Sequence, residues 1–165
     1  MKITKKSIFA IIECALFVAA ILFLIAPALR FSEKVLGVKV VEEISGFQVA
    51  FGSDKYSLSF SFVAFLAFLF LIVGAVLSCC KLFVKDAKIQ KVFNIVILIV
   101  GIVAAVFYFS SKTGLMINPK ADDIKASDVA DIFDAWDLGV GALFAAILAL
   151  AGGALACVDQ FLIKE

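Results

Sequence analysis

The sequence predicts an all-α membrane protein, an antiparallel four-helix transmembrane bundle with a small extracellular antiparallel β-sheet and a short surface helix. Hydrophobic residues make up 64% of its 165 positions, which is more than a soluble domain usually holds. Four long apolar stretches each reach the roughly 20 residues that a helix needs to cross the hydrocarbon layer. Lysine-rich segments also alternate with acidic ones along the chain.

The four predicted spans form a single membrane domain over residues 1–165. They cover residues 7–29, 57–80, 92–111 and 138–158, and Glu13 is the one charged residue inside them. The first span follows three lysines and is longer than the roughly 7–15 apolar residues of a secretory signal. We therefore expect it to stay on the protein uncleaved.

The charge distribution predicts the orientation. Segments 1–6, 81–91 and 159–165 carry eight lysines in 24 residues, whereas segments 30–56 and 112–137 carry seven lysines and arginines in 53 residues. Cytoplasmic segments of membrane proteins are enriched in Lys and Arg. We expect a multi-pass protein of the plasma membrane with both termini in the cytoplasm.

The first outer loop, 30–56, has the chemistry of strands. A β-branched run crosses residues 35–41, a second alternating run covers 47–51, and residues 52–55 are typical of a turn. Strict alternation of large apolar residues with serine follows over 56–62, and period two favours a strand. These patterns predict a two- or three-stranded antiparallel sheet, with residues 114–118 as a further candidate strand.

The second outer loop predicts a short amphipathic helix at the membrane surface. Ser127 is a candidate N-cap, and aspartates follow at positions 128, 131 and 134. This spacing favours a solvated helix face over a divalent-cation site, because it fits no known calcium loop. Trp136 ends the segment, where an interfacial aromatic anchor is expected.

Small residues recur every four positions along the fourth span and predict a helix-packing face. Gly101 with Ala105, and Gly74 with Ser78, offer matching surfaces on other spans. Packing within one chain and packing against a partner subunit both remain open. The predicted face consists of Gly141, Ala145, Ala149, Gly153 and Cys157.

Glu13 is the strongest candidate for a functional residue, because an acid inside the membrane is costly. It is a candidate anchor between helices, a proton- or cation-handling group, or a side chain that reaches back to the interface. Asn94 enters the third span at a similar depth and is a candidate hydrogen-bond partner. Lys81 and Lys85 are candidate cationic partners.

Catalytic, cofactor and metal sites are not expected. The chain contains no histidine, the commonest general base and zinc ligand, and it lacks nucleotide-binding and metalloprotease motifs. The four cysteines fall in the cytoplasmic half of the predicted topology, where buried, reduced thiols are expected. Palmitoylation and a thiolate metal site with Glu13 or Asp159 remain alternatives.

The arrangement of four spans with a strand-rich first outer loop resembles that of claudin-like proteins. The loop lacks the tryptophans and cysteines of claudins, so paracellular sealing is not implied. The acid in Ile12-Glu13-Cys14-Ala15 is similar to that of small multidrug resistance transporters, in which it would couple transport. The Lys- and Phe-rich composition resembles that of small membrane proteins from Firmicutes-type bacteria.

The leading functional hypothesis is a non-enzymatic scaffold or accessory subunit that acts through helix packing and its outer sheet. Its expected partners are the lipid bilayer and other membrane subunits or a second copy, without nucleic acid. The alternative is a small transporter, or a subunit of one, in which Glu13 handles a proton or cation.

Overall fold

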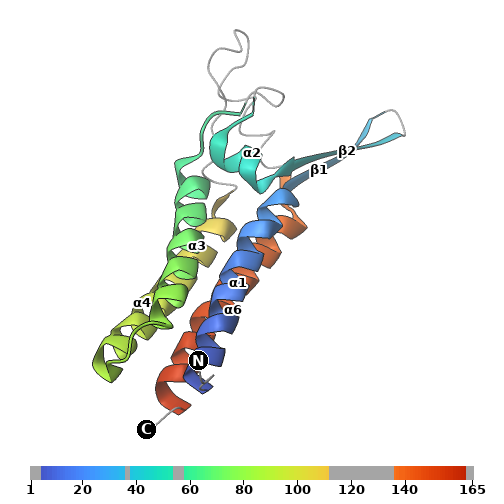
Figure 1. Ribbon diagram of the computed structural model, residues 1–165. Helices are drawn as coiled ribbons and strands as arrows, with labels where there is room; N and C mark the ends of the chain where they lie inside the picture. Colours follow the sequence, from blue (N-terminus) through green and yellow to red (C-terminus); the bar gives the residue numbers. More distant parts are fainter. Residues whose placement is uncertain (1–4, 36–37, 54–57, 112–135, 163–165) are drawn as a thin grey trace.

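A computed structural model describes residues 5–35, 38–53, 58–111 and 136–162 (Figure 1). Its main elements are four helices that are long and apolar enough to cross a membrane, as predicted. They are α1 (Lys5–Leu22), α3 (Phe62–Lys81), α4 (Ala87–Phe109) and α6 (Val140–Leu162). A short 3-10 turn, η1 (Phe23–Ile25), extends α1.

The four long helices pack side by side in a closed order. Helix α1 contacts α3 and α6, and α4 contacts the same two helices from the other side. Successive helices run in opposite directions, so both chain ends and the connection between α3 and α4 lie at the same end (Figure 1). The sheet lies at the opposite end.

Buried positions on each helix repeat at alternating spacings of three and four residues. This period keeps one stripe of each helix facing its neighbours. Most stripe residues are small, which lets the helix backbones approach closely. The buried stripes are Ala10, Glu13, Phe17, Ala20, Leu24; Ala64, Ala67, Leu71, Gly74, Ser78, Lys81; Asn94, Ile97, Gly101, Ala104, Tyr108; and Ala142, Ala145, Ala149, Gly152, Ala156, Asp159.

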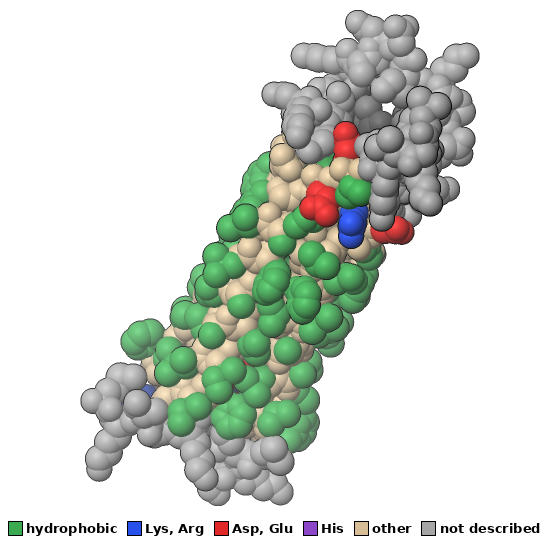
Figure 2. All heavy atoms as spheres, turned by 90° about the vertical axis from the view of Figure 1, so that its right-hand side faces the viewer, with side chains coloured by type: hydrophobic (Ala, Val, Ile, Leu, Met, Phe, Trp, Pro, Cys, Tyr) green, Lys and Arg blue, Asp and Glu red, His purple; other side chains and the backbone are tan. Residues whose placement is uncertain are grey.

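The outward faces of the helices are apolar. Side chains such as Ile99, Val106 and Ile147 are about half exposed or more. Figure 2 shows hydrophobic side chains covering the helical part of the visible face, with charged groups gathered near the sheet end. The helices therefore present their apolar residues both to one another and to the surroundings.

The predicted small antiparallel sheet is present and has three strands in the part of the chain that the structure describes. Strands β1 (Pro27–Val35), β2 (Val38–Ser45) and β3 (Trp136–Leu138) lie in the order β2-β1-β3. Leu29 pairs with Leu138 and Phe31 with Trp136. The hairpin of β1 and β2 extends sideways beyond the helices (Figure 1). The third strand of the sheet comes from residues 136–138. The candidate strand 114–118 and the predicted surface helix lie outside the described residues.

The alternating segment 47–51 is not a strand, contrary to the prediction. It belongs to α2 (Gly46–Phe51), which begins with a capping box between Ser45 and Gln48. Such a box satisfies two backbone N–H groups and nucleates a helix. The rings of Phe47 and Phe51 then lie four residues apart and both pack edge-on against Phe68 of α3.

The ends of the spans also differ from the predicted ones. Residues 27–29 belong to β1, so the first apolar helix stops earlier. The second helix begins only at Phe62, after its N-cap Ser61. Within the alternating segment 56–62, Leu58 forms an isolated bridge with Ser53. Gly52 ends α2 as its C-cap, and its positive φ of 86° is a conformation that glycine adopts readily.

Candidate functional site

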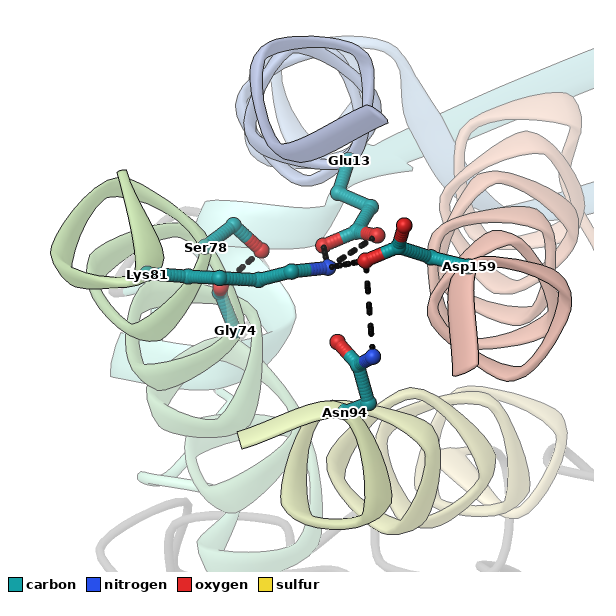
Figure 3. Close-up of polar contacts among 6 residues, drawn as sticks. All are labelled: Glu13, Gly74, Ser78, Lys81, Asn94 and Asp159. Atoms are coloured by element: carbon teal, nitrogen blue, oxygen red, sulfur yellow. Dashed lines mark hydrogen bonds and ion pairs between the residues drawn. The ribbon is translucent and has the colours of Figure 1, made fainter. Parts of the chain in front are cut away.

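One polar side chain from each long helix converges at the end where both chain ends lie (Figure 3). We call this set the polar layer; it consists of Glu13, Lys81, Asn94 and Asp159. Each of the four continues the buried stripe of its own helix. The regular spacing of the helices therefore brings residues from distant parts of the sequence to one level.

Lys81 is the centre of the polar layer. Its ammonium nitrogen Nζ lies 2.8 Å from Glu13 Oε1 and 3.1 Å from Glu13 Oε2. The same nitrogen lies 2.7 Å from Asp159 Oδ2. Asn94 Nδ2 donates a longer hydrogen bond of 3.4 Å to that carboxylate oxygen. A single lysine thus bridges acids from α1 and α6, and the amide adds α4.

The polar layer is almost completely closed off from its surroundings. Glu13 is 0% exposed, Lys81 3%, Asn94 4% and Asp159 7%. A buried charge is strongly unfavourable unless an opposite charge and hydrogen bonds compensate for its lost solvation. The short contacts to Lys81 provide that compensation for both acids.

The charges of the layer do not balance when every group is ionised. Two carboxylates and one ammonium leave one negative charge. Among the described residues, Asn94 Oδ1 and Asp159 Oδ1 are buried oxygens without a hydrogen-bond partner. The layer therefore has unused acceptors for one proton or for a small donor.

The local sequence explains how Lys81 reaches the layer. It is the last residue of α3 and lies three positions after Ser78 on the same buried stripe. Ser78 Oγ donates to the carbonyl oxygen of Gly74 at 2.8 Å, so the serine satisfies its hydroxyl within its own helix. The Ser78 hydroxyl therefore needs no partner in the polar layer, and the ammonium group of Lys81 pairs with the two acids.

The structure brings together the sequence candidates Glu13 and Asn94, although the amide of Asn94 meets Asp159. Lys81 contacts Glu13, whereas Lys85 is exposed in the connection after α3. Asp159 does not belong to the predicted packing face, because a four-residue spacing along the fourth span leads to Cys157 instead. The alternating spacing of the α6 stripe leads directly to Asp159.

Four members of the predicted small-residue face are buried, and Cys157 is only half-buried. A four-residue step overshoots a helical turn by about 40°, so the row drifts off the buried side. The buried part of this face packs closely against α4. A methyl group on Gly101 of α4 would lie 2.5 Å from the carbonyl oxygen of Ala149 and 3.1 Å from Gly153 Cα.

A second close contact places the ring of Phe17 between two glycines. A methyl group on Gly74 would lie 2.5 Å from Phe17 Cε1, and one on Gly152 would lie 2.9 Å from Phe17 Cε2. Phe17 is 0% exposed. The two glycines on α3 and α6 therefore make the space into which α1 inserts its largest buried side chain.

The prediction of buried cysteines is wrong for Cys79 and Cys80, which are exposed. Cys14 and Cys157 are half-buried. Within the described part of the chain, no three His, Cys, Asp or Glu side chains are grouped as a metal ion would require. Trp136 lies in β3, where its backbone pairs with Phe31.

Fold and site together define a mostly helical protein whose four long apolar helices meet in a buried ionic layer. No family model, curated protein or solved structure matches the chain.

Proposed function

We propose that this chain is an integral membrane protein in which α1, α3, α4 and α6 form a transmembrane bundle. The length and hydropathy of the four helices support it. Their outward apolar side chains also support it, because water would solvate such a surface poorly and lipid would solvate it well. Its membrane is the plasma membrane, and the sheet faces away from the cytoplasm.

The proposed orientation rests on lysines at the end of the helix bundle that holds the polar layer. Lys85, Lys88 and Lys91 follow α3 at the end that also holds both chain termini. Thiol labelling of intact cells tests this orientation in a cysteine-free background. A cysteine at exposed Glu42 reacts with an impermeant maleimide, whereas one at exposed Lys85 reacts only after the membrane is opened. The reverse pattern contradicts the orientation.

We infer that the protein is a non-enzymatic scaffold or accessory subunit. The observation that carries this inference is the closure of the polar layer, in which ionic contacts of 2.7–3.1 Å join three helices and leave at most 7% of any member exposed. A buried ionic network that is paired in this way fixes helix register. A fixed helix register favours a role as a rigid membrane scaffold for other components.

The proposed contact surface is the hairpin of β1 and β2. Strand β2 is an edge of the described sheet, and an open edge can accept a strand from a partner. Its Val41 is exposed. The partner is another membrane subunit or a second copy of this chain.

Photo-cross-linking in cells tests the hairpin. A photoreactive amino acid at Val41 is expected to give a discrete protein adduct, whereas the same group at the outward-facing Ile147 on α6 gives lipid adducts only. Equal yields of protein adducts at the two positions, or none at Val41, contradict a contact role for the hairpin.

The second candidate function is transport of a proton or small cation. The excess negative charge of the polar layer and the unpartnered Asp159 Oδ1 favour it, because proton pathways use buried acids. Vesicles with purified protein test it: transport requires a pH-driven flux that Glu13→Gln or Asp159→Asn reduces at least about tenfold. Flux equal to that of protein-free vesicles excludes transport and leaves the scaffold.

A further inference from the structure

Two thiols meet beside the polar layer. The Sγ atoms of Cys14 and Cys79 lie 2.8 Å apart, and 65 positions separate them in the sequence. Cys14 directly follows Glu13, and Cys79 lies two residues before Lys81. The thiol contact and the ion pair therefore join the same two helices, α1 and α3, at almost the same level.

We propose that Cys14 and Cys79 are a redox-active pair that closes reversibly to an intramolecular disulfide and ties α1 covalently to α3. Both are free thiols in the structure. Closure breaks one S–H bond on each cysteine and forms one S–S bond. Two electrons and two protons pass to an oxidant, and a thiol reductant returns the pair to two thiols.

The oxidant is a lipid-soluble two-electron acceptor of the quinone class, which leaves as the quinol. Cys79 is exposed, and Val76 one turn away on α3 is exposed beside it. On α1, Ile11, one turn before Cys14, is exposed on the same side of the helix. An apolar oxidant therefore has direct access to the pair from the surrounding lipid. This choice of oxidant rests on the proposed membrane placement, whereas closure of the pair rests on the sulfur contact alone.

Cys80 and Cys157 provide matched controls. Neighbouring residues on a helix point about 100° apart, so Cys80 is directed away from Cys14. In the described part of the chain, neither Cys80 nor Cys157 contacts another sulfur. Side-chain direction thus specifies which two cysteines form the disulfide. Moving one of the two cysteines by one residue should prevent the disulfide from forming.

Thiol counting tests the proposal. In membranes, the Cys80→Ala/Cys157→Ala variant is treated with diamide, whose N=N bond takes up the two hydrogens, and is then denatured and labelled with a maleimide mass tag. We expect two tags before oxidation, none after it, and two again after dithiothreitol, all on monomeric protein. The control variant Cys79→Ala/Cys157→Ala, which keeps Cys14 and Cys80, should carry two tags throughout.

Two outcomes would overturn the proposal: both tags remain on the Cys14–Cys79 protein after diamide, or the control pair closes equally well. Decylubiquinone replaces diamide to test the class of oxidant, and closure with diamide alone contradicts the quinone. The oxidised protein should also unfold about 5 °C or more above its reduced form, because the closed loop is long. An unchanged midpoint temperature of thermal unfolding contradicts a covalent tie between α1 and α3.

Discussion

Lys81 Nζ lies 2.8 Å from Glu13 Oε1, and this contact joins the last residue of α3 to the third turn of α1. The same ammonium lies 2.7 Å from Asp159 Oδ2 on α6. Among the described residues, Lys81 is therefore the one cation that compensates these two buried acids. Its removal leaves both acids without this ionic partner, whereas removal of either acid leaves an ion pair intact.

We predict that Lys81→Met destabilises the folded protein by about 3–5 kcal/mol, the range expected when a buried ionic contact loses one partner. Denaturant-induced unfolding in mild detergent measures the change. Lys85→Met is the matched control, because Lys85 is exposed, and it should change the free energy of unfolding by less than about 0.5 kcal/mol. Equal effects of the two variants would contradict the structural role of the layer.

We predict that Gly153→Leu disrupts packing between α4 and α6. A methyl group there would already lie 3.2 Å from the carbonyl oxygen of Leu98, and a larger side chain forces the helices apart. The expected loss is about 1–3 kcal/mol, as for other overpacked sites. Ala154→Leu, one residue away on the exposed face, should be nearly neutral. The same unfolding measurement compares the pair, and a neutral Gly153→Leu would refute the close crossing.

We predict that Gly74→Ala and Phe17→Leu compensate each other. The methyl group that Gly74→Ala adds needs space that the phenyl ring occupies, and the smaller leucine frees some of it. Each single variant should destabilise the protein, and the double variant should lose about 0.5–2 kcal/mol less than the sum of the single losses. Additive losses in a double-mutant cycle would show that the two residues do not share this space.

We predict that Ser45→Ala loosens α2. The serine hydroxyl accepts from the backbone N–H of Gln48, and the Gln48 side chain accepts from the backbone N–H of Ser45. Loss of such a cap costs about 1 kcal/mol. Hydrogen exchange of the α2 amides should accelerate by about fivefold, and Ser45→Thr should restore most of the protection. Unchanged exchange in Ser45→Ala would mean that packing alone holds α2.

The parts of the fold with long, regular signals could be predicted from the sequence. The four apolar runs predict the four long helices, and the β-branched residues around Val35–Val41 predict the hairpin of β1 and β2. Helix α2 could not be recognised from the alternation of residues 47–51, because five residues are too few to distinguish the two-residue period of a strand from the 3.6-residue period of a helix. Its decisive signal is the Ser45–Gln48 capping box. Strand β3 has three residues, too few for any periodic signal, and pairs only through tertiary structure.

The polar layer was predictable in part. Glu13 is conspicuous because it is a charge inside an apolar run. Lys81 and Asp159 lie at the ends of such runs, where a charged residue is usually solvated and carries no signal by itself. Lys81 is a candidate partner of Glu13 from the sequence, and the alternating spacing of the buried residues places both Lys81 and Asp159 in the layer, because Gly74, Ser78 and Lys81 continue one stripe and Gly152, Ala156 and Asp159 continue another.

The most direct test of the central claim, that the polar layer ties the helices together, is the coupling energy between Glu13 and Lys81. A double-mutant cycle with Glu13→Gln and Lys81→Met measures it through the free energy of unfolding in detergent. We predict a coupling of about 1–3 kcal/mol, with the double variant more stable than additivity requires, and none between Glu13→Gln and Lys85→Met. Additive effects in both cycles would contradict the claim.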